Sequence, residues 1–210
     1  MARYTGSKTK LSKRVGRNLF LKGARSYSAK DDYAKKPYKA GAHGKNRPGK
    51  LSEFGKQLLE KQAIKFTYGL MEKQLSNLFK KAFKQTGDTG KIALALLERR
   101  LDNVVYKAGL ANSRSQARQL VSHGHFNIDG KPVNIPSYTV STAEVITIKE
   151  NKLKNPFWQN FQLSVPPGTP TWLDSSKNNQ IKVLNLPLEE DLPNDFKIGP
   201  VVEYYSRKVA

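Results

Sequence analysis

Residues 94–135 read LALLERRLDNVVYKAGLANSRSQARQLVSHGHFNIDGKPVNI, and the period of their hydrophobic residues changes part-way along. In the first part, apolar residues recur at spacings of three and four, which predicts a helix with one apolar face that ends at Gly109. The residues of this face are Leu94, Leu97, Leu101, Val104, Val105 and Ala108. After Gly124 the period becomes two, which is typical of strands with one buried face.

A second helix is expected between these two parts. Ser113 is followed three residues later by Gln116, which is a capping-box pattern, and Gly124 suits the position just after the end of that helix. Asp129-Gly130 separates two short alternating segments and therefore predicts a hairpin. This stretch predicts two helices packed on a small twisted sheet.

The flanking sequence predicts a second, mainly helical part. From Ser52, which suits a helix N-cap, to Phe83 the apolar residues recur mostly at helical spacings, and Gly69 marks a break between two helices. We predict an α+β protein with four segments. They are a basic, extended N-terminal arm at residues 1–50, a helical domain at 51–95, an inserted module at 96–158, and a C-terminal segment at 159–210 that returns to the helical domain.

The charge of the chain limits the classes of partner. Lys and Arg number 37 against 17 Asp and Glu, a formal net charge of +20, and residues 1–50 hold 15 basic and 2 acidic residues, which gives +13 for this segment alone. Such a surplus calls for a polyanion, either nucleic acid or an anionic membrane surface. The arm is too basic and too poor in large apolar residues to fold alone, so we expect it to order against phosphates.

Other protein classes are excluded or disfavoured by the sequence. The chain has no run of eighteen apolar residues, its first residues do not resemble a signal peptide, and it has no cysteine for disulfides or thiolate metal sites. Residues 56–84 are a weak candidate for a membrane-surface helix and fit a domain core better.

Two arginines of the second helix are the first candidates for contact with RNA. Arg114 and Arg118 lie four residues apart, beside a helix N-terminus whose free N–H groups suit a phosphate. On the preceding helix, Arg99, Asn103 and Tyr106 fall roughly opposite the apolar face. Spacing alone leaves open the alternative of a solvated charged face.

Three apparent catalytic, metal or nucleotide sites are discounted. Arg100-Leu101-Asp102 is similar to the Arg-Leu-Asp of pseudouridine synthases, but no catalytic domain follows it. His123 and His125 could form a metal pair, but no further ligand is close in sequence, so we expect a structural or RNA-facing role. Residues 41–45 lack the strand and the Ser or Thr of a nucleotide-binding loop.

The residues at 96–106, 113–125 and 127–138 resemble the small RNA-binding module named after the fourth protein of the small ribosomal subunit. The flanks at 1–6, 50–62, 170–173 and 202–205 resemble the ribosomal family itself. Two features depart from that family: residues 40–44 read AGAHG where many members have PGQHG, and the absence of cysteine rules out the zinc site of some members. Residues 151–165 and 174–200 match poorly.

The resemblance implies a non-enzymatic protein without cofactor, metal or small-molecule substrate, located on a cytoplasmic or organellar ribosome and not at a membrane. It implies primary binding to small-subunit rRNA that nucleates assembly of the subunit body, contact with the fifth small-subunit protein, a place near the mRNA entry path, and a part in translational accuracy. The implied rRNA-binding residues are Arg3, Lys8, Lys10, Lys13, Arg14, Arg17, Lys22, His43, Lys45, Arg47, Lys50, Lys56, Lys61, Arg99, Arg100, Asn103, Tyr106, Lys107, Arg114, Gln116, Arg118 and His123. The alternatives are a free-standing RNA-binding or chaperone protein that carries the same module, and an RNA-modifying or tRNA-charging enzyme, for which the chain has no room.

Overall fold

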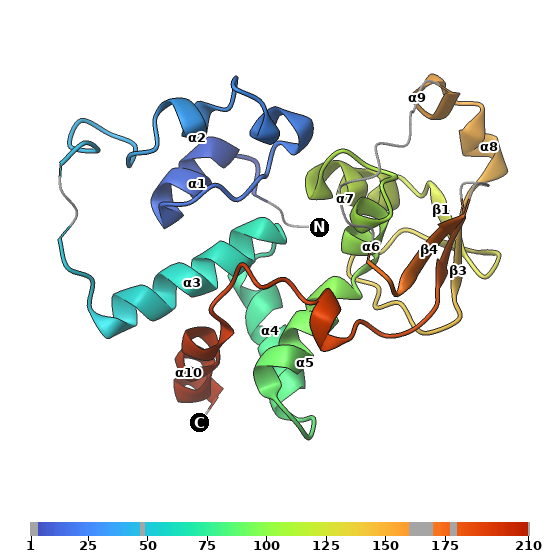
Figure 1. Ribbon diagram of the computed structural model, residues 1–210. Helices are drawn as coiled ribbons and strands as arrows, with labels where there is room; N and C mark the ends of the chain where they lie inside the picture. The colour runs from blue at the N-terminus through green and yellow to red at the C-terminus, as the bar shows by residue number, and fades with distance from the viewer. Residues whose placement is uncertain (1–3, 47–48, 160–169, 177–179, 210) are drawn as a thin grey trace. The chain divides into compact units, whose positions relative to one another are not determined.

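The computed structural model describes residues 4–46, 49–159, 170–176 and 180–209. The chain divides into two compact units (Figure 1). Unit 1 comprises residues 1–93 and 193–210, and unit 2 comprises residues 94–192. The mixed helical and sheet composition confirms the predicted α+β class.

Three helices form the centre of unit 1, namely α3 (Glu53–Thr67), α4 (Glu72–Phe83) and α10 (Ile198–Val209). Helix α3 begins where the sequence predicts it, because the Ser52 side chain accepts a hydrogen bond from the N–H of Gly55. The predicted break before α4 is also present, since Gly69 has a φ of +63°, which favours glycine.

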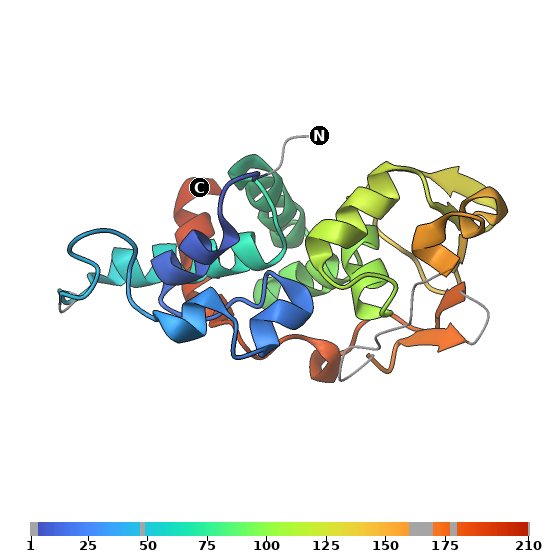
Figure 2. The same ribbon diagram turned by 90° about the horizontal axis from the view of Figure 1, so that it is seen from above.

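The C-terminal helix closes the core of unit 1. Helix α10 packs against both α3 and α4 (Figures 1 and 2). The rings of Phe79 and Tyr205 stack with centroids 4.6 Å apart, and Ile64 of α3 and Leu75 of α4 are fully buried. Val201 and Tyr205 of this C-terminal helix are therefore part of the core.

The N-terminal segment is more ordered than the extended arm that we expected. It contains α1 (Lys8–Val15), the 3₁₀ helix η1 (Gly23–Tyr27) and α2 (Asp32–Lys35), and α1 contacts α3. Leu11 and Leu19 are buried. Carboxylates offset part of the local positive charge, because Arg17 makes two hydrogen bonds to Glu60, of 2.9 and 3.4 Å, and Lys22 pairs with Asp32.

Two short helices stand where the apolar pattern predicted one long helix, and the boundary between the two units falls within the first of them. Helix α5 (Thr89–Glu98) ends before Arg100, and α6 (Leu101–Lys107) starts after it. Arg100 adopts an extended conformation and forms a β-bridge with Thr139, and the N–H of Leu101 donates to the carbonyl of Tyr138. Pairing with a distant segment therefore breaks the helix. Helix α7 (Arg114–Ser122) follows its N-cap Ser113, where the sequence predicted the helix to start.

The sheet of unit 2 is antiparallel and has the order β2-β1-β3-β5-β4. Its strands are β1 (Phe126–Ile128), β2 (Lys131–Val133), β3 (Val145–Ile148), β4 (Leu173–Ser176) and β5 (Gln180–Val183). The predicted hairpin joins β1 and β2, with positive φ at both Asp129 and Gly130.

The last two strands differ from the predicted division of the chain. Strand β5 pairs with both β3 and β4, so the last two strands extend the sheet of the module, and unit 2 continues to Leu192. We expected the segment at 159–210 to return to the helical domain, and only its final part, from residue 193, belongs to unit 1.

One apolar core holds the helices of unit 2 on its sheet. Val104 and Val121 from α6 and α7 are buried in the same cluster as Phe126, Ile146 and Trp172. Helices α8 (Glu150–Leu153) and α9 (Pro156–Gln159) follow β3, and the 3₁₀ helix η2 (Glu189–Asp191) follows β5. This core fixes the position of the basic side chains that α6 and α7 carry.

Candidate nucleic-acid interface

Arg114 is held in place by residues of the neighbouring helix. Its Nε donates a 2.8 Å hydrogen bond to Oδ1 of Asn103, and its guanidinium carbon lies 4.7 Å from the ring centroid of Tyr106. The amide nitrogen of Asn103 in turn donates to the buried carboxylate of Glu98 at 2.8 Å. Arg114 is half-buried in the first turn of α7, so this cation is oriented beside a helix N-terminus.

Three other predicted residues of unit 2 lie inside it. Arg100 makes two hydrogen bonds to Asp102, of 3.1 and 2.8 Å, and a guanidinium nitrogen of Arg118 lies 4.0 Å from the same carboxylate. Arg100, Arg118 and Asn103 are 6%, 7% and 1% exposed, respectively. We therefore correct their assignment: these three side chains stabilise the contact between α6 and α7 and are not available to phosphates. Buried charges need such partners.

The remaining predicted residues around α6 and α7 are half-buried. The Nε of Arg99 donates to the carbonyl of Val140 at 2.9 Å, and Nζ of Lys107 lies 3.9 Å from the carboxylate of Glu98. Gln116 accepts from the N–H of Asn112 rather than from Ser113, so the expected capping box is replaced by the Ser113 cap alone. Each of these groups is positioned by a protein contact.

The two histidines after α7 have different environments. His123 is exposed, whereas His125 is buried and its Nδ1 accepts a 2.9 Å hydrogen bond from the indole N–H of Trp158. Burial lowers the pKa of His125, and the nearby Lys152, His123 and Lys149 lower it further. In the part of the chain that the structure describes, no three His, Cys, Asp or Glu side chains form a group that could hold a metal ion.

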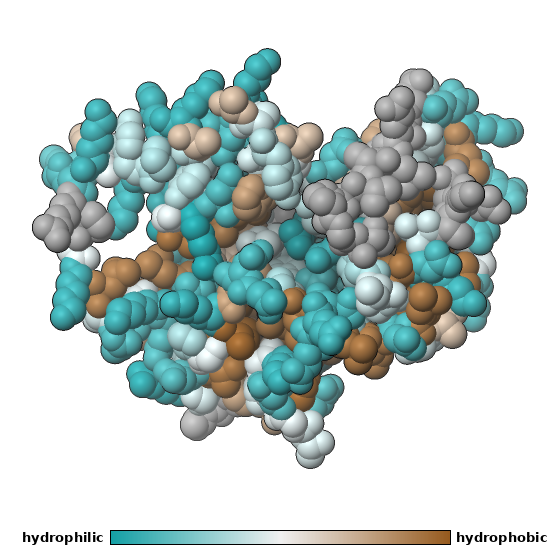
Figure 3. Space-filling view, viewed as in Figure 1, coloured by the Kyte–Doolittle hydropathy of each residue, from teal (hydrophilic) through white to brown (hydrophobic). Residues whose placement is uncertain are grey.

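The N-terminal segment presents most of the exposed cations among the predicted residues. The ammonium groups of Lys13 and Lys45 lie 5.5 and 5.7 Å from the ring centroid of Tyr38, so α1 and the loop after α2 meet there. Lys13 is half-buried, and the predicted residues that are exposed in this segment are Lys10, Arg14, His43, Lys45 and Lys50. Arg3 and Arg47 lie outside the described residues. Hydrophilic side chains cover most of the face that this segment presents in Figure 3.

Several predicted cations of unit 1 have partners within the protein. Arg17 and Lys22 bind carboxylates as described above, Lys8 donates to the carbonyl of Leu21, and Lys56 pairs with Glu53 on the surface of α3. Lys61 is corrected, because it is 4% exposed and donates to Glu72 at 2.8 Å. Although burial favours the protonated acid, hydrogen bonds from Lys61 and Lys65 lower the pKa of Glu72 to about 2.

Sequence reasoning left out some exposed cations that lie close to the predicted ones. Four of them belong to the segment around α2, where the sequence is dense in lysine, and this density is the signal that could have identified them. They are Lys30, Lys35, Lys36 and Lys39.

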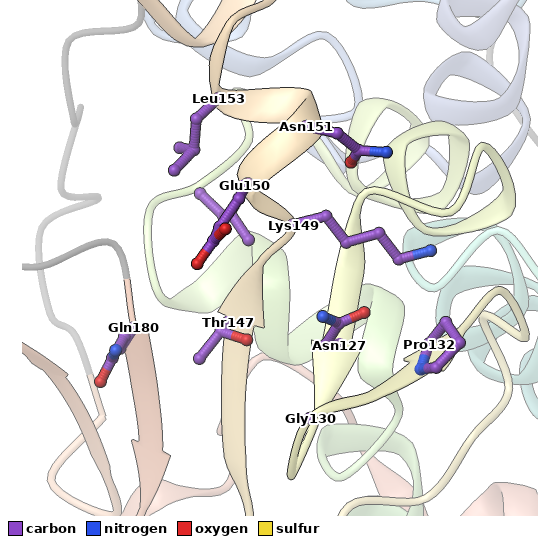
Figure 4. A pocket seen from close by; sticks show the side chains of 10 residues that line it. Asn127, Gly130, Pro132, Thr147, Lys149, Glu150, Asn151, Leu153 and Gln180 are labelled. Carbon is purple, nitrogen blue, oxygen red and sulfur yellow. The ribbon is translucent and has the colours of Figure 1, made fainter.

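A polar hollow of about 680 Å³ lies on the sheet beside α8 (Figure 4). Asn127 and Thr147 from the strands line it together with Lys149, Glu150 and Asn151 from the start of α8. The predicted rRNA-binding residues do not line this hollow.

The comparison with known proteins assigns both parts of the chain. Residues 3–98 match the family described as "Ribosomal protein S4/S9 N-terminal domain", and residues 99–146 match the S4 domain. The chain belongs to the S4 family. It is 46% identical over 209 residues to the small ribosomal subunit protein uS4 of Caldicellulosiruptor saccharolyticus, and 44% identical over 209 residues to that of Thermodesulfovibrio yellowstonii. Each alignment covers 99% of this chain and 100% of the relative.

The S4 family assignment confirms the resemblance found in the sequence. The two matches meet at residues 98 and 99, between α5 and α6, where the structure breaks the expected long helix. Strands β4 and β5 lie beyond the residues that match the S4 domain. No described helix has the length and apolar character needed to cross a bilayer.

Proposed function

We propose that this S4-family protein is a non-enzymatic structural component of the small ribosomal subunit that binds rRNA directly. The observation that carries the proposal is the contrast between the two kinds of basic residue. The buried arginines Arg100 and Arg118 both lie against the carboxylate of Asp102, whereas Lys10, Arg14, Lys45 and Lys50 are exposed on a segment with a net charge of +13. Exposed cations on a folded support are suited to the phosphates of structured RNA.

The two units contribute in different ways. The N-terminal segment supplies a high density of positive charge. Its contribution to RNA affinity should therefore weaken as the salt concentration rises. Arg114 supplies one oriented guanidinium beside the N-terminus of α7, with exposed His123 at the other end of that helix. We assign selectivity for the shape of an rRNA junction to this surface of α7.

More specific roles and partners follow from the resemblance to the family. We propose that binding is primary and nucleates assembly of the subunit body, and that the protein contacts the fifth small-subunit protein. We also propose a position near the mRNA entry path, a contribution to translational accuracy, and location on a cytoplasmic or organellar ribosome. The full-length similarity to uS4 proteins of bacteria supports these proposals.

Sedimentation tests the proposal against a free RNA chaperone. Tagged protein is produced in cells, the extract is fractionated at moderate and at high salt, and the tag is measured across the gradient. We expect the tag with small subunits at both salt concentrations. Protein that stays at the top of the gradient, with RNA of mixed size, would instead support the free-standing RNA-binding protein.

A further inference from the structure

Three leucines after β5 form an exposed apolar strip, defined here as residues 184–188. Leu184, Leu186 and Leu188 are 43%, 44% and 65% exposed, while Val183 and Pro187 are buried. Asn185, between the first two leucines, is exposed as well, so residues 184–186 are open to solvent together. Single exposed leucines are ordinary on a protein surface, but three exposed leucines within five residues suggest an interaction site.

Hydrogen bonds fix both ends of this strip. The N–H of Leu184 donates to the carbonyl of Trp172 at 2.9 Å, which continues the pairing between β5 and β4. At the other end, Asp191 accepts from the N–H of Leu188 at 3.2 Å and from Oγ1 of Thr171 at 3.0 Å. The strip is thus a positioned surface, so little ordering free energy is lost when a partner docks on it.

The charge beside the strip is opposite to that of the chain. Residues 184–192 contain Glu189, Glu190 and Asp191 and no Lys or Arg, whereas the whole chain carries +20. The side chains of Glu189 and Glu190 are exposed. Phosphates would be repelled here, and leucines offer them no hydrogen bond, so this surface does not suit RNA or an anionic membrane.

We propose that the strip, together with Glu189 and Glu190, docks a lysine- and arginine-rich segment of another protein. Carboxylates would pair with the cationic heads, and the leucines would cover the aliphatic stems of the same side chains. This inference goes beyond the proposed function, because it assigns a protein partner to a surface of unit 2 that carries none of the predicted rRNA-binding residues.

Photocrosslinking at position 186 tests the docking. We would replace Leu186 by p-benzoylphenylalanine in the full chain, irradiate cells that produce it, and identify the crosslinked peptide by mass spectrometry. The expected result is one protein segment rich in Lys and Arg. Crosslinks to rRNA, to a second copy of this chain or to an acidic or neutral segment, or no crosslink, would each overturn the proposal.

Two variants control this experiment. Glu189→Lys with Glu190→Lys should lower the crosslink yield at least about fivefold, because it places like charges against the partner. The same photoreactive residue at Ile135, which is 52% exposed and has no carboxylate within two positions along the chain, should not crosslink to that segment. An unchanged yield in the double variant would also overturn the proposal. Association with small subunits, measured on the same samples, is expected to stay unchanged.

Discussion

The Nε of Arg114 on α7 lies 2.8 Å from Oδ1 of Asn103 on α6, and the amide nitrogen of Asn103 lies 2.8 Å from the carboxylate of Glu98. One buried amide thus joins a cation near the surface to a carboxylate in the interior. Because Asn103 is 1% exposed, its orientation is set by the core. The guanidinium of Arg114 is consequently positioned before any RNA is present.

Replacing Asn103 by Ala should destabilise unit 2 by about 2–3 kcal/mol, because it removes three hydrogen bonds from a buried network: two that Asn103 donates to the carboxylate and the backbone carbonyl of Glu98, and one that it accepts from Arg114. Both tryptophans of the chain, Trp158 and Trp172, are buried in unit 2, so urea unfolding followed by tryptophan fluorescence reports on that unit. Asn134→Ala at an exposed position is the control and should change the free energy of unfolding by less than about 0.5 kcal/mol. An equal effect of the two changes would show that the network contributes nothing.

Asp102→Asn should destabilise unit 2 more than Asp174→Asn, which removes an exposed carboxylate. The change keeps the shape of the side chain but leaves two buried guanidiniums, of Arg100 and Arg118, without the negative charge between them. Uncompensated buried charge costs about 3–5 kcal/mol. The same fluorescence measurement tests this, with Asp174→Asn as the matched variant. If the Asp102→Asn variant and the wild-type protein have the same urea midpoint of unfolding, the two guanidiniums are not buried as the structure shows.

The arginines show which parts of the interface the sequence could predict. A spacing of four correctly places Arg114 and Arg118 on neighbouring turns of α7. Spacing does not say whether that side faces water or α6, and this depends on Asp102, which is brought near by the break at Arg100. Local sequence therefore predicted the helix and its cap, and tertiary pairing decided the exposure of the side chains.

The N-terminal segment and the last strands show the same limit. Composition predicted that residues 1–50, an extended arm with short ordered pieces, would not fold without phosphates, but Glu60 on α3 binds Arg17, and Asp31 and Asp32 bind cations and amides within the segment itself. Strand β5 pairs with β3 across more than thirty residues of chain. Neither the ion pair with a later helix nor this strand pairing leaves a periodic signal in the sequence.

Acid should weaken unit 1 through Glu72. The pKa of this carboxyl, about 2 against an ordinary 4.5, is lower in the folded protein, so its stabilising contribution is present above pH 4.5 and is lost as the pH falls towards 2. The group is half-exposed, and after allowance for solvent screening we expect a contribution of about 1 kcal/mol. Circular dichroism during urea unfolding, at several pH values, should show that Glu72→Gln is less stable than wild type at pH 6 and equal to it near pH 2. A constant difference across this range would exclude titration of Glu72 as the cause.

Exposed cations of the N-terminal segment should control the salt dependence of RNA binding. Replacing Lys10, Arg14, Lys45 and Lys50 by Ala should lower the slope of log affinity against log salt by roughly 0.7–0.9 for each phosphate contact that is lost. Equilibrium binding to small-subunit rRNA at several salt concentrations measures that slope. The matched control replaces four exposed lysines of or next to α4, namely Lys73, Lys80, Lys81 and Lys84. A similar fall in slope for both variants would mean that net charge, and not this surface, determines binding.

Direct binding of the purified chain to rRNA tests the central claim. The chain alone, without other proteins, is titrated in a filter-binding experiment against a multi-helix junction fragment of small-subunit rRNA and against an unrelated RNA duplex of equal length at the same salt concentration. We predict clear preference for the junction in the wild-type protein, and a smaller preference in Arg114→Ala, which removes the oriented guanidinium. Equal affinity of the wild-type protein for the two RNAs would contradict the account of a primary, structure-specific rRNA-binding protein.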